Sequence, residues 1–246
     1  MTLPEPGKPY VVALVPAKLS SQRIPGKNRI SLSGQELFVF SILAGMQTSG
    51  ITEVFVSSES GAVLESAGLL GAQPILRPVA LSAPDVTNQT VIEHALNEVQ
   101  RLRGRRPDLL VLLQPTHPFR CPRDIEAAIK VLLDDAEADS VFALRPFEDL
   151  TGAIVEGRFL PDSPLPRNRE GERRGYMNTG SFYVLRVSHT IDRGSFFGSV
   201  IKGFLLTRPE MEIDIDRPEQ LAMARGLAEL FHDDLLSYGL IAQRTE

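Results

Sequence analysis

Short apolar runs alternate with segments of helical periodicity along most of this chain, and this order constrains the fold more than any other feature. Strand-like apolar runs lie at residues 11–15, 53–56, 109–113, 141–144, 181–185, 204–206 and 211–215. Apolar positions spaced by three or four predict helices at residues 38–46, 63–70, 91–99 and 125–133, and a last helix after Asp216 with Pro218 in its first turn. Fully apolar strands are typical of parallel sheets covered by helices on both faces. The order therefore predicts an α/β fold, a three-layer Rossmann-like domain with a mostly parallel sheet.

The length of the chain predicts one domain. Its 246 residues and 43% hydrophobic content allow one substantial core, so we expect a single domain over residues 1–246. The periodic order breaks between residues 145 and 174. Four prolines lie there among charges and glycines: Pro146, Pro161, Pro164 and Pro166. Such a stretch forms either a small subdomain or a mobile loop, and we expect a small inserted region at residues 145–180.

Composition excludes several classes of protein. The net charge of −5 argues against nucleic-acid binding through phosphate contacts. Cys121 is the only cysteine, so the chain forms no intramolecular disulfide, which is typical of a reducing compartment. The first ten residues lack the apolar core of a signal peptide, and no run approaches the ~20 apolar residues of a membrane span. We therefore expect a cytoplasmic protein that binds neither nucleic acid nor membrane.

The first apolar run leads into an irregular segment, VPAKLSSQRIPGKN, at residues 15–28. Its prolines, serines and glycine leave backbone N–H groups free for anionic oxygens, while Lys18, Arg23 and Lys27 supply positive charge. A Walker A loop is excluded because Ser21 stands where that motif needs glycine, and the dinucleotide fingerprint with three spaced glycines is absent. The segment predicts a triphosphate site of another kind. The alternative is a polar surface loop between a strand and a helix.

Two acidic residues near the C-terminus, Asp214 and Asp216, are candidate metal ligands. Alternate residues of a strand share a face, so both carboxylates are expected to point the same way at a strand end. Neighbouring carboxylates repel unless a cation lies between them, and Mg²⁺ on a triphosphate is held by one or two carboxylates plus phosphate oxygens. We therefore expect a Mg²⁺ site here. The alternative makes Asp216 a helix N-cap and Asp214 a solvent-facing strand residue.

The run LLQPTHPFR at residues 112–120 follows the most buried predicted strand. A loop at the carboxyl end of a central parallel strand is where open α/β sheets bind ligands. Gln114 offers both a donor and an acceptor, which suits sugar hydroxyls. The alternative is a rigid strand-to-helix loop. His117 either contacts substrate or titrates near neutrality, but a surface position is the expectation for a lone loop histidine.

These motifs resemble the cytidylyltransferases that activate ulosonic acids, the CMP-sialic acid synthetases or acylneuraminate cytidylyltransferases. The resemblance runs from Val11 to about Leu230 and includes VPAKLSSQRIPGKN, Asp-Ile-Asp at 214–216 and Gln-Pro-Thr-His-Pro at 114–118. It extends to residues 76–88 and to RRGYMNTGSFY at 173–183, which is similar to the family's Tyr-x-Pro-Asn-Gly-Ala-Ile-Tyr segment. Several positions depart from the family pattern: Lys18 replaces Arg, Glu59 replaces Asp, Pro84 replaces Asp, His117 replaces Ser and Thr179 replaces Asn.

The resemblance implies a nucleotidyltransferase that transfers CMP from CTP to the anomeric hydroxyl of an acidic, sialic-acid-like sugar and releases pyrophosphate. It implies Mg²⁺ held by Asp214 and Asp216, and a homodimer in which residues 145–180 reach into the partner's site. The implied catalytic residues are Lys18, Arg23 and Lys27. The implied nucleotide contacts are Ala17, Ser21, Asn28, Arg77, Ser82 and Thr87, and the implied sugar contacts are Gln114, Thr116, Arg173, Arg174, Tyr176 and Tyr183. Arg173 or Arg174 would bind the sugar carboxylate in bidentate fashion.

Two other functions stay open from the sequence. One is a nucleotidyltransferase of the same fold that uses another nucleotide or a smaller acidic acceptor, which the departures at Pro84 and Thr179 allow. The other is a nucleotide-binding regulatory protein without turnover, which the presence of both Asp214 and Asp216 disfavours. At single positions, Thr87 and Asn88 are alternatively helix-capping residues, and Arg173 and Arg174 are alternatively exposed loop charges.

Overall fold

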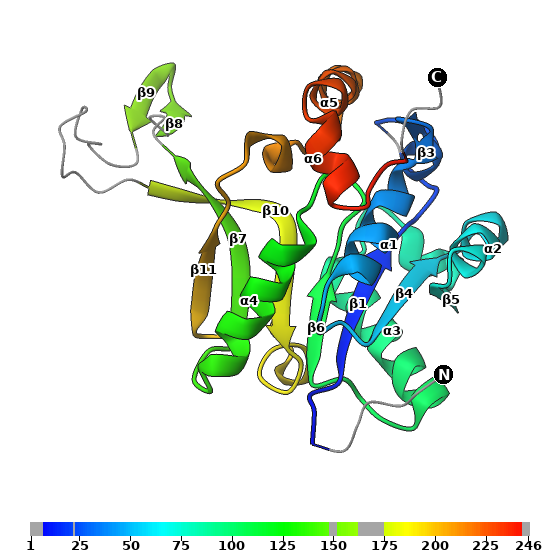
Figure 1. Cartoon of the computed structure of the whole chain (residues 1–246). Coiled ribbons are helices and arrows are strands. Elements are labelled where there is room, and N and C mark those ends of the chain that lie inside the picture. Colours follow the sequence, from blue (N-terminus) through cyan, green and yellow to red (C-terminus); the bar gives the residue numbers. More distant parts are fainter. Residues whose placement is uncertain (1–6, 22, 148–151, 162–174, 243–246) are drawn as a thin grey trace.

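A seven-stranded sheet forms the centre of the molecule, in the order β11-β7-β10-β6-β1-β4-β5 (Figure 1). The computed structural model describes residues 7–21, 23–147, 152–161 and 175–242. The strands of the sheet are β1 (Val11–Pro16), β4 (Glu53–Ser58), β5 (Gln73–Leu76), β6 (Leu109–Leu112), β7 (Ser140–Phe147), β10 (Gly175–Arg186) and β11 (Ile201–Leu205). Only β10 runs antiparallel to its neighbours in this sheet. The prediction of a mostly parallel sheet is confirmed.

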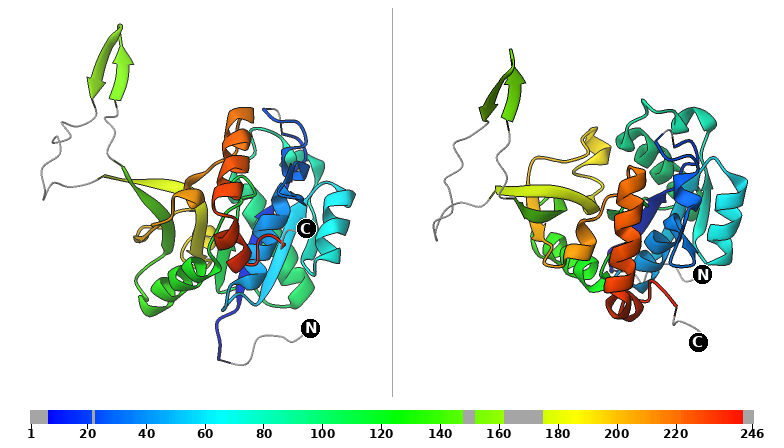
Figure 2. Two further views of the ribbon diagram at one scale, coloured as in Figure 1. Left: turned by 45° about the horizontal axis from the view of Figure 1, so that its top comes forward. Right: turned by 90° about the horizontal axis from the view of Figure 1, so that it is seen from above.

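Helices cover both faces of this sheet (Figures 1 and 2). One face carries α1 (Leu37–Gln47), α2 (Gly61–Leu69), α4 (Pro122–Asp134), α5 (Pro218–Leu230) and α6 (His232–Ser237). The other face carries α3 (Asn88–Arg103) and the 3₁₀ turn η3 (Ile191–Arg193). Three further 3₁₀ turns are η1 (Lys27–Arg29), η2 (Val79–Ser82) and η4 (Pro209–Glu212). Within the described ranges, no helix combines the length and apolarity needed to cross a membrane.

Strand β1 shows how the sequence produces these layers. Its side chains alternate between the faces: Val11, Ala13 and Val15 pack into the cluster under α1 and α4, while Val12 and Leu14 pack into the cluster under α3. All five are at most 1% exposed. An apolar side chain at every position is therefore required by burial on both faces, which is why the run lacks the polar alternation of a half-exposed strand.

The predicted strand at residues 211–215 is wrong. The chain forms η4 there and then continues in extended backbone outside the sheet, whose edge strand on that side is β11. Met211, Ile213 and Ile215 are still buried, so the alternation of apolar side chains is real. The Ile215 N–H donates to the carbonyl of Thr116 at 2.8 Å, which joins this segment to the loop after β6. A two-residue apolar period thus marks extended chain that packs on a core without a strand partner.

Strand β10 links the body of the fold to an outlying hairpin. Its inner half pairs with β6, whereas its outer residues, Gly175–Asn178, pair only with the far end of β7. Between the described ends of β7 and β10 in the sequence, β8 (Gly152–Val155) and β9 (Arg158–Pro161) form a two-stranded hairpin that stands apart from the layers (Figure 2). The hairpin lies within the predicted insertion at residues 145–180. A small pair formed by β2 (Ser31–Leu32) and β3 (Gln35–Glu36) precedes α1.

A fully buried guanidinium fixes the loop after β6. Arg120 donates from Nε to the Ser181 carbonyl at 2.5 Å and from a terminal nitrogen to Ser41 Oγ at 2.9 Å, on β10 and α1 respectively. It also donates to the carbonyl of Gln114 at 2.5 Å. Burial lowers the pKa of Arg120 to about 9. Because each of the three nitrogens donates to a protein oxygen, one side chain holds two secondary-structure elements and the loop after β6 in one arrangement.

Candidate active site

A cleft of about 340 Å³ lies beyond the carboxyl ends of β1, β5 and β6. The cleft therefore occupies the place where open α/β sheets bind ligands. It lies at the end of β1, which has β4 on one side and β6 on the other. Nine of the predicted site residues line it together: Lys18, Ser21, Arg23, Lys27, Asn28, Arg77, Gln114, Thr116 and Asp216. Pro84 and Asn88 also line it. Residues that are distant in the sequence thus form one polar cavity.

The segment after β1 is held from below so that its polar groups face the cleft. The Ala17 N–H donates to the Ser57 carbonyl at 2.9 Å, and Ser58 Oγ donates to the Ala17 carbonyl at 2.7 Å. Asn28 is buried, and its Nδ2 donates to the carbonyl of Lys18 at 2.7 Å. Ala17 is therefore an anchor of the loop and does not line the cleft. Asn28 both anchors the loop and lines the cleft. Its Oδ1 has no hydrogen-bond partner within the described part of the chain.

Two cations of this loop converge on Asp216. Lys27 Nζ lies 2.8 Å from Asp216 Oδ1 and also donates to the Ile215 carbonyl at 2.9 Å, while Arg23 lies 2.6 Å from Asp216 Oδ2. Gly26 has a φ of 63° at the start of η1, a left-handed turn that glycine makes without strain. Partial burial alone would raise the pKa of Asp216, but the hydrogen bond and charge of Lys27, with the charge of Arg23, hold that pKa below its usual range. Asp216 is therefore ionised at neutral pH.

Asp214 lies close enough to Asp216 for their charges to interact, but in a different environment. Burial raises the pKa of Asp214 above its usual range; the charge of Asp216 adds to the increase, and the Thr116 hydroxyl, Lys27 and Arg23 oppose it. Its Oδ1 is buried without a hydrogen-bond partner among the residues described. The two carboxylates approach each other without a strand, so the expected proximity is found but the strand that would cause it is not.

Asp216 is also not the N-cap of the last helix. Arg217 takes that position, and the N–H groups of Asp216 and Arg217 both donate to Gln220 Oε1, at 2.9 and 2.8 Å. The side chain of Gln220, in the first turn of α5, thus accepts from two N–H groups that precede the helix, as the N3 residue of a capping box does. The Asp216 carboxylate is left free to face the cleft.

Glu59 is the principal contributor that motif reasoning missed. It follows β4 and accepts from the Leu19 N–H at 2.8 Å and from Ser82 Oγ at 2.8 Å, and it pairs with the Arg77 guanidinium at 3.2 Å. Burial would raise the pKa of Glu59, but these hydrogen bonds and the charge of Arg77 lower it below its usual range. One carboxylate thus joins the phosphate-loop candidate to the segment after β5. The signal was present as a charged residue at the end of a parallel strand.

Three of the predicted nucleotide contacts, Arg77, Ser82 and Thr87, occupy different positions relative to the cleft. Arg77 is buried against Glu59 and still lines the cleft. Ser82 is buried, and its carbonyl accepts from Ser20 Oγ at 2.9 Å, so it supports the loop from behind. Thr87 is the N-cap of α3, where its Oγ1 accepts from the Thr90 N–H at 3.2 Å. The helix-capping alternative is therefore confirmed for Thr87, while Asn88 is the first residue of the helix.

The predicted sugar contacts are brought together only in part. Gln114 and Thr116 line the cleft, whereas Tyr176 is exposed on the outer part of β10 and does not line it. Tyr183 is buried and its hydroxyl accepts from Asn178 Nδ2 at 2.9 Å. Arg173 and Arg174 lie outside the described residues.

The expectation that His117 is a surface residue is wrong. Its side chain is 3% exposed and lies beneath β10, next to Gly180. Burial, together with the charge of Arg120, lowers the pKa of His117 to about 3, so the imidazole is neutral at physiological pH. A lone histidine in a loop carries no sequence signal that distinguishes burial from exposure, because burial depends on which strand crosses above it.

The sequence matches the family described as Cytidylyltransferase over residues 12–239. It is 32% identical over 238 residues to the CMP-N,N'-diacetyllegionaminic acid synthase of Legionella pneumophila, covering 92% of this chain and 99% of that protein. It is 26% identical over 219 residues to the N-acylneuraminate cytidylyltransferase of Escherichia coli, covering 84% of this chain and 49% of that protein. The predicted family resemblance is confirmed.

A solved structure shares the fold. It is described as CMP:2-keto-3-deoxy-manno-octonic acid synthetase complexed with CTP, with a TM-score of 0.67 and 19% identity. The match covers 90% of this chain and 99% of that chain. The overall fold of this chain is therefore shared with a solved structure.

The Glu59 network predicts a pH-dependent loss of stability in Glu59→Gln. Removing the charge beside Arg77, whose side chain is 2% exposed, is expected to cost about 2 kcal/mol at neutral pH, or about 4–8 °C in Tm. The folded-state pKa of Glu59 lies below its ordinary 4.5, so this stability is present above pH 4.5 and is lost as the pH falls through the folded-state pKa. Thermal unfolding of both proteins between about pH 3 and pH 7 measures it.

Glu98→Gln is the matched control, because Glu98 pairs with Arg101 on the exposed face of α3. Its Tm is expected to stay within about 1–2 °C of the wild type. A Tm difference for Glu59→Gln that stays constant from neutral to acidic pH would show that the charge of Glu59 is not the cause.

Proposed function

This chain belongs to the cytidylyltransferase family, and from that membership we propose that it transfers CMP from CTP to the anomeric hydroxyl of a sialic-acid-like ulosonic acid and releases pyrophosphate. The observation that carries the proposal is the convergence of Lys27 and Arg23 on Asp216 across a polar cleft at the carboxyl edge of the sheet. The named relatives act in the same class: one is a diacetyllegionaminic acid synthase and another an N-acylneuraminate cytidylyltransferase.

The cleft suits a nucleoside triphosphate. Lys18, Arg23 and Lys27 approach it from one loop and offset the charge of the phosphates. Arg77 and Asn88 also line the cleft and offer donors and acceptors for a base edge. Because Glu59 binds both Arg77 and the Leu19 N–H, the base side and the phosphate side keep a fixed separation. A rigid spacing between the two favours one nucleotide geometry.

The reaction is the transfer of a phosphoryl group that carries the nucleoside. The protein mainly positions the two substrates and neutralises the charge of the phosphates. The anomeric oxygen of the sugar attacks the α-phosphorus and loses its proton, while the bond between the α-phosphorus and the bridging oxygen breaks and pyrophosphate leaves. Gln114 faces the cleft from the loop after β6 and is placed to hold the acceptor. Lys27 and Arg23 stabilise charge that gathers on phosphate oxygens in the transition state.

The residues present also fit a divalent cation. Asp214 has a buried oxygen without a hydrogen-bond partner in the described chain, and its pKa is raised by burial and further by Asp216, as expected for a site that gains from a bound cation. Mg²⁺ uses one or two carboxylates and otherwise phosphate oxygens and water, so this pair is sufficient. We propose that Asp214 and Asp216 hold Mg²⁺, which would neutralise charge on the triphosphate when bound.

A homodimer and a cytoplasmic location belong to the same proposal. The hairpin of β8 and β9 exposes every residue of both strands, and Ile154 and Phe159 face each other across it. An isolated two-stranded hairpin is marginal in water, and apolar side chains gathered on it mark a contact surface. A second copy of the chain is the occupant that we propose. The single cysteine is consistent with a reducing, CTP-containing cytoplasm.

Pyrophosphate release tests the activity. CTP with neuraminic, legionaminic or pseudaminic acid is expected to give turnover, and CTP is expected to exceed ATP, GTP and UTP by at least ~10-fold, because a wrong base leaves buried polar groups unpaired. Lys27→Ala is expected to lower kcat by ~10²–10³-fold. Glu98→Gln serves as the control. Preference for another nucleotide or for a small acidic acceptor would favour the alternative transferase, and no turnover with CTP binding would favour a regulatory protein.

Metal dependence is tested separately. EDTA is expected to abolish turnover, and Asp216→Asn to lower kcat at least ~100-fold, since it removes charge from the proposed metal site. Asp234→Asn, which changes an acidic residue on α6, is the control and should retain the wild-type rate. Full turnover in EDTA would contradict the metal proposal without affecting the assignment of CTP.

The dimer predicts a mass change in solution. Ile154 is 78% exposed and Phe159 is 50% exposed, so the double variant Ile154→Asp/Phe159→Asp is expected to convert a species with the mass of two chains into a single chain in sedimentation equilibrium. Leu69→Asp, at an apolar position that is 86% exposed on α2, is the control. A wild-type protein with the mass of one chain at micromolar concentration would contradict the proposal.

A further inference from the structure

The imidazole of His117 is enclosed beside the proposed metal site, although it lies in a loop. Strand β10 passes over it at Gly180, where a Cβ would lie 3.0 Å from His117 Cε1 and 3.4 Å from Nε2. Gly180 has a φ of +78° and lies where the register of β10 on β7 shifts. Any larger side chain there would meet the imidazole and strain the backbone. The imidazole of His117 therefore fits beneath β10 because residue 180 is glycine.

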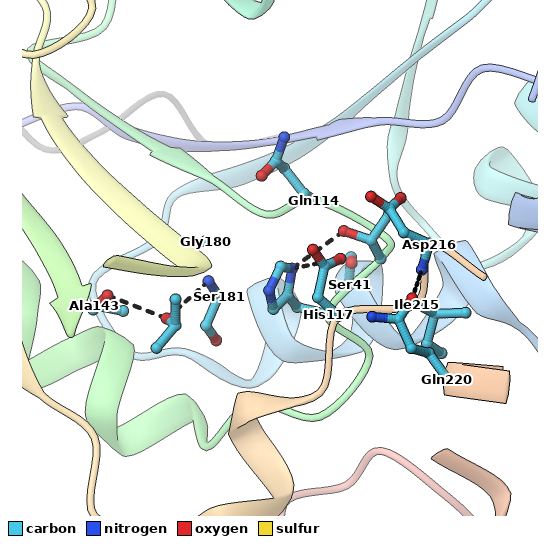
Figure 3. Close-up of polar contacts among 12 residues, drawn as sticks. Ser41, Gln114, His117, Ala143, Gly180, Ser181, Ile215, Asp216 and Gln220 are labelled. Atoms are coloured by element: carbon cyan, nitrogen blue, oxygen red, sulfur yellow. Dashed lines mark hydrogen bonds and ion pairs between the residues drawn. The ribbon is translucent and has the colours of Figure 1, made fainter. Parts of the chain in front are cut away.

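The imidazole of His117 is drawn in Figure 3, and its ring nitrogen Nδ1 faces both Thr116 and Asp214. It lies 3.1 Å from Thr116 Oγ1 and 3.7 Å from Asp214 Oδ1. The same loop is joined to the acidic segment through its backbone, because the Ile215 N–H donates to the Thr116 carbonyl. Two independent contacts, one of the main chain and one of side chains, thus connect the loop after β6 to the segment that carries Asp214.

The charge around the ring decides where its single proton lies. Nδ1 is the ring nitrogen with polar neighbours, whereas the buried Nε2 has no hydrogen-bond partner among the described residues. A lone pair on Nδ1 would face the Asp214 carboxylate and repel it, so the tautomer with the proton on Nδ1 is favoured. Thr116 Oγ1 then accepts from Nδ1 and has its own proton available for Asp214. Thr116 is a side-chain hydrogen-bond donor to Asp214.

We propose that His117 is a positioning residue for Asp214, in which Nδ1–H fixes Thr116 and Thr116 orients the carboxylate toward a divalent cation bound with the nucleotide. This inference rests on the proposed metal role of Asp214. Groups that orient metal ligands without touching the metal typically contribute 10–100-fold to metal affinity. Serine, which stands at this position in the motif of the family that the chain resembles, lacks a ring nitrogen and could not make this contact.

Paired substitutions separate the ring nitrogens. In His117→Asn the amide nitrogen takes the place of Nδ1, and in His117→Gln it takes the place of Nε2, while both variants lose the ring. The measured quantity is the metal-dependent gain in CTP affinity, the ratio of the Kd for CTP in EDTA to the Kd for CTP with Mn²⁺, by calorimetry without acceptor. We expect His117→Gln to reduce this ratio by ~10-fold or more and His117→Asn by less than ~3-fold. The Kd in EDTA should be unchanged in both.

Thr116→Val and Thr116→Ser give a second pair if the histidine variants unfold. Valine lacks the hydroxyl that joins His117 to Asp214 and should reduce the ratio by ~10-fold, whereas serine should restore it. Equal ratios in His117→Gln, His117→Asn and wild type would overturn the inference, as would equal losses in the two histidine variants, which indicate packing alone. Asp214→Asn distinguishes the two proposals: a ratio unchanged in that variant would overturn the metal role of Asp214 itself.

Discussion

The ion pair between Lys27 and Asp216 is the interaction on which the arrangement of the site depends. It joins two residues 189 positions apart at a distance of 2.8 Å, with the lysine side chain 11% exposed. Lys27 Nζ also binds the Ile215 carbonyl, so the C-terminal segment is held by its backbone as well as its side chain. Because the segment has no strand partner, these contacts and the Thr116–Ile215 hydrogen bond determine where Asp214 and Asp216 lie.

Three carboxylates around the cleft have different roles because their surroundings differ. Glu59 is enclosed by donors and has a lowered pKa, which suits a residue that holds two segments together. Asp216 faces the cleft, and Lys27 and Arg23 keep it ionised by lowering its pKa. Asp214 is partly buried with a raised pKa, which suits a ligand that gains from a metal. The surroundings of each carboxylate, more than its residue type, therefore distinguish Glu59, which holds the structure together, from the two aspartates at the proposed metal site.

Strand β10 connects the site to the outlying hairpin. Its inner residues cover His117 and place Tyr183 against Phe142, while its outer residues extend along β7 toward β8 and β9. The register shift near Gly180 separates these two parts. Arg120 binds the Ser181 carbonyl next to that shift, so the buried guanidinium fixes the point from which the outer part of β10 departs.

The three-layer arrangement of helices on both faces of a sheet was predictable from the amino-acid sequence. Strands buried on both faces require apolar residues at every position, as β1 shows. The sequence also predicted the cationic loop and the acidic pair, since Lys27 and Asp216 are visible as motifs. It could not predict that residues 211–215 leave the sheet, because a two-residue apolar period is common to strands and to extended loops. The charge of Glu59 at the end of a strand was visible in the sequence, but its partners and the burial of His117 were not. The roles of these two residues depend on Arg77, Ser82 and Gly180, which are distant in sequence, and no local pattern records which buried groups will face one another.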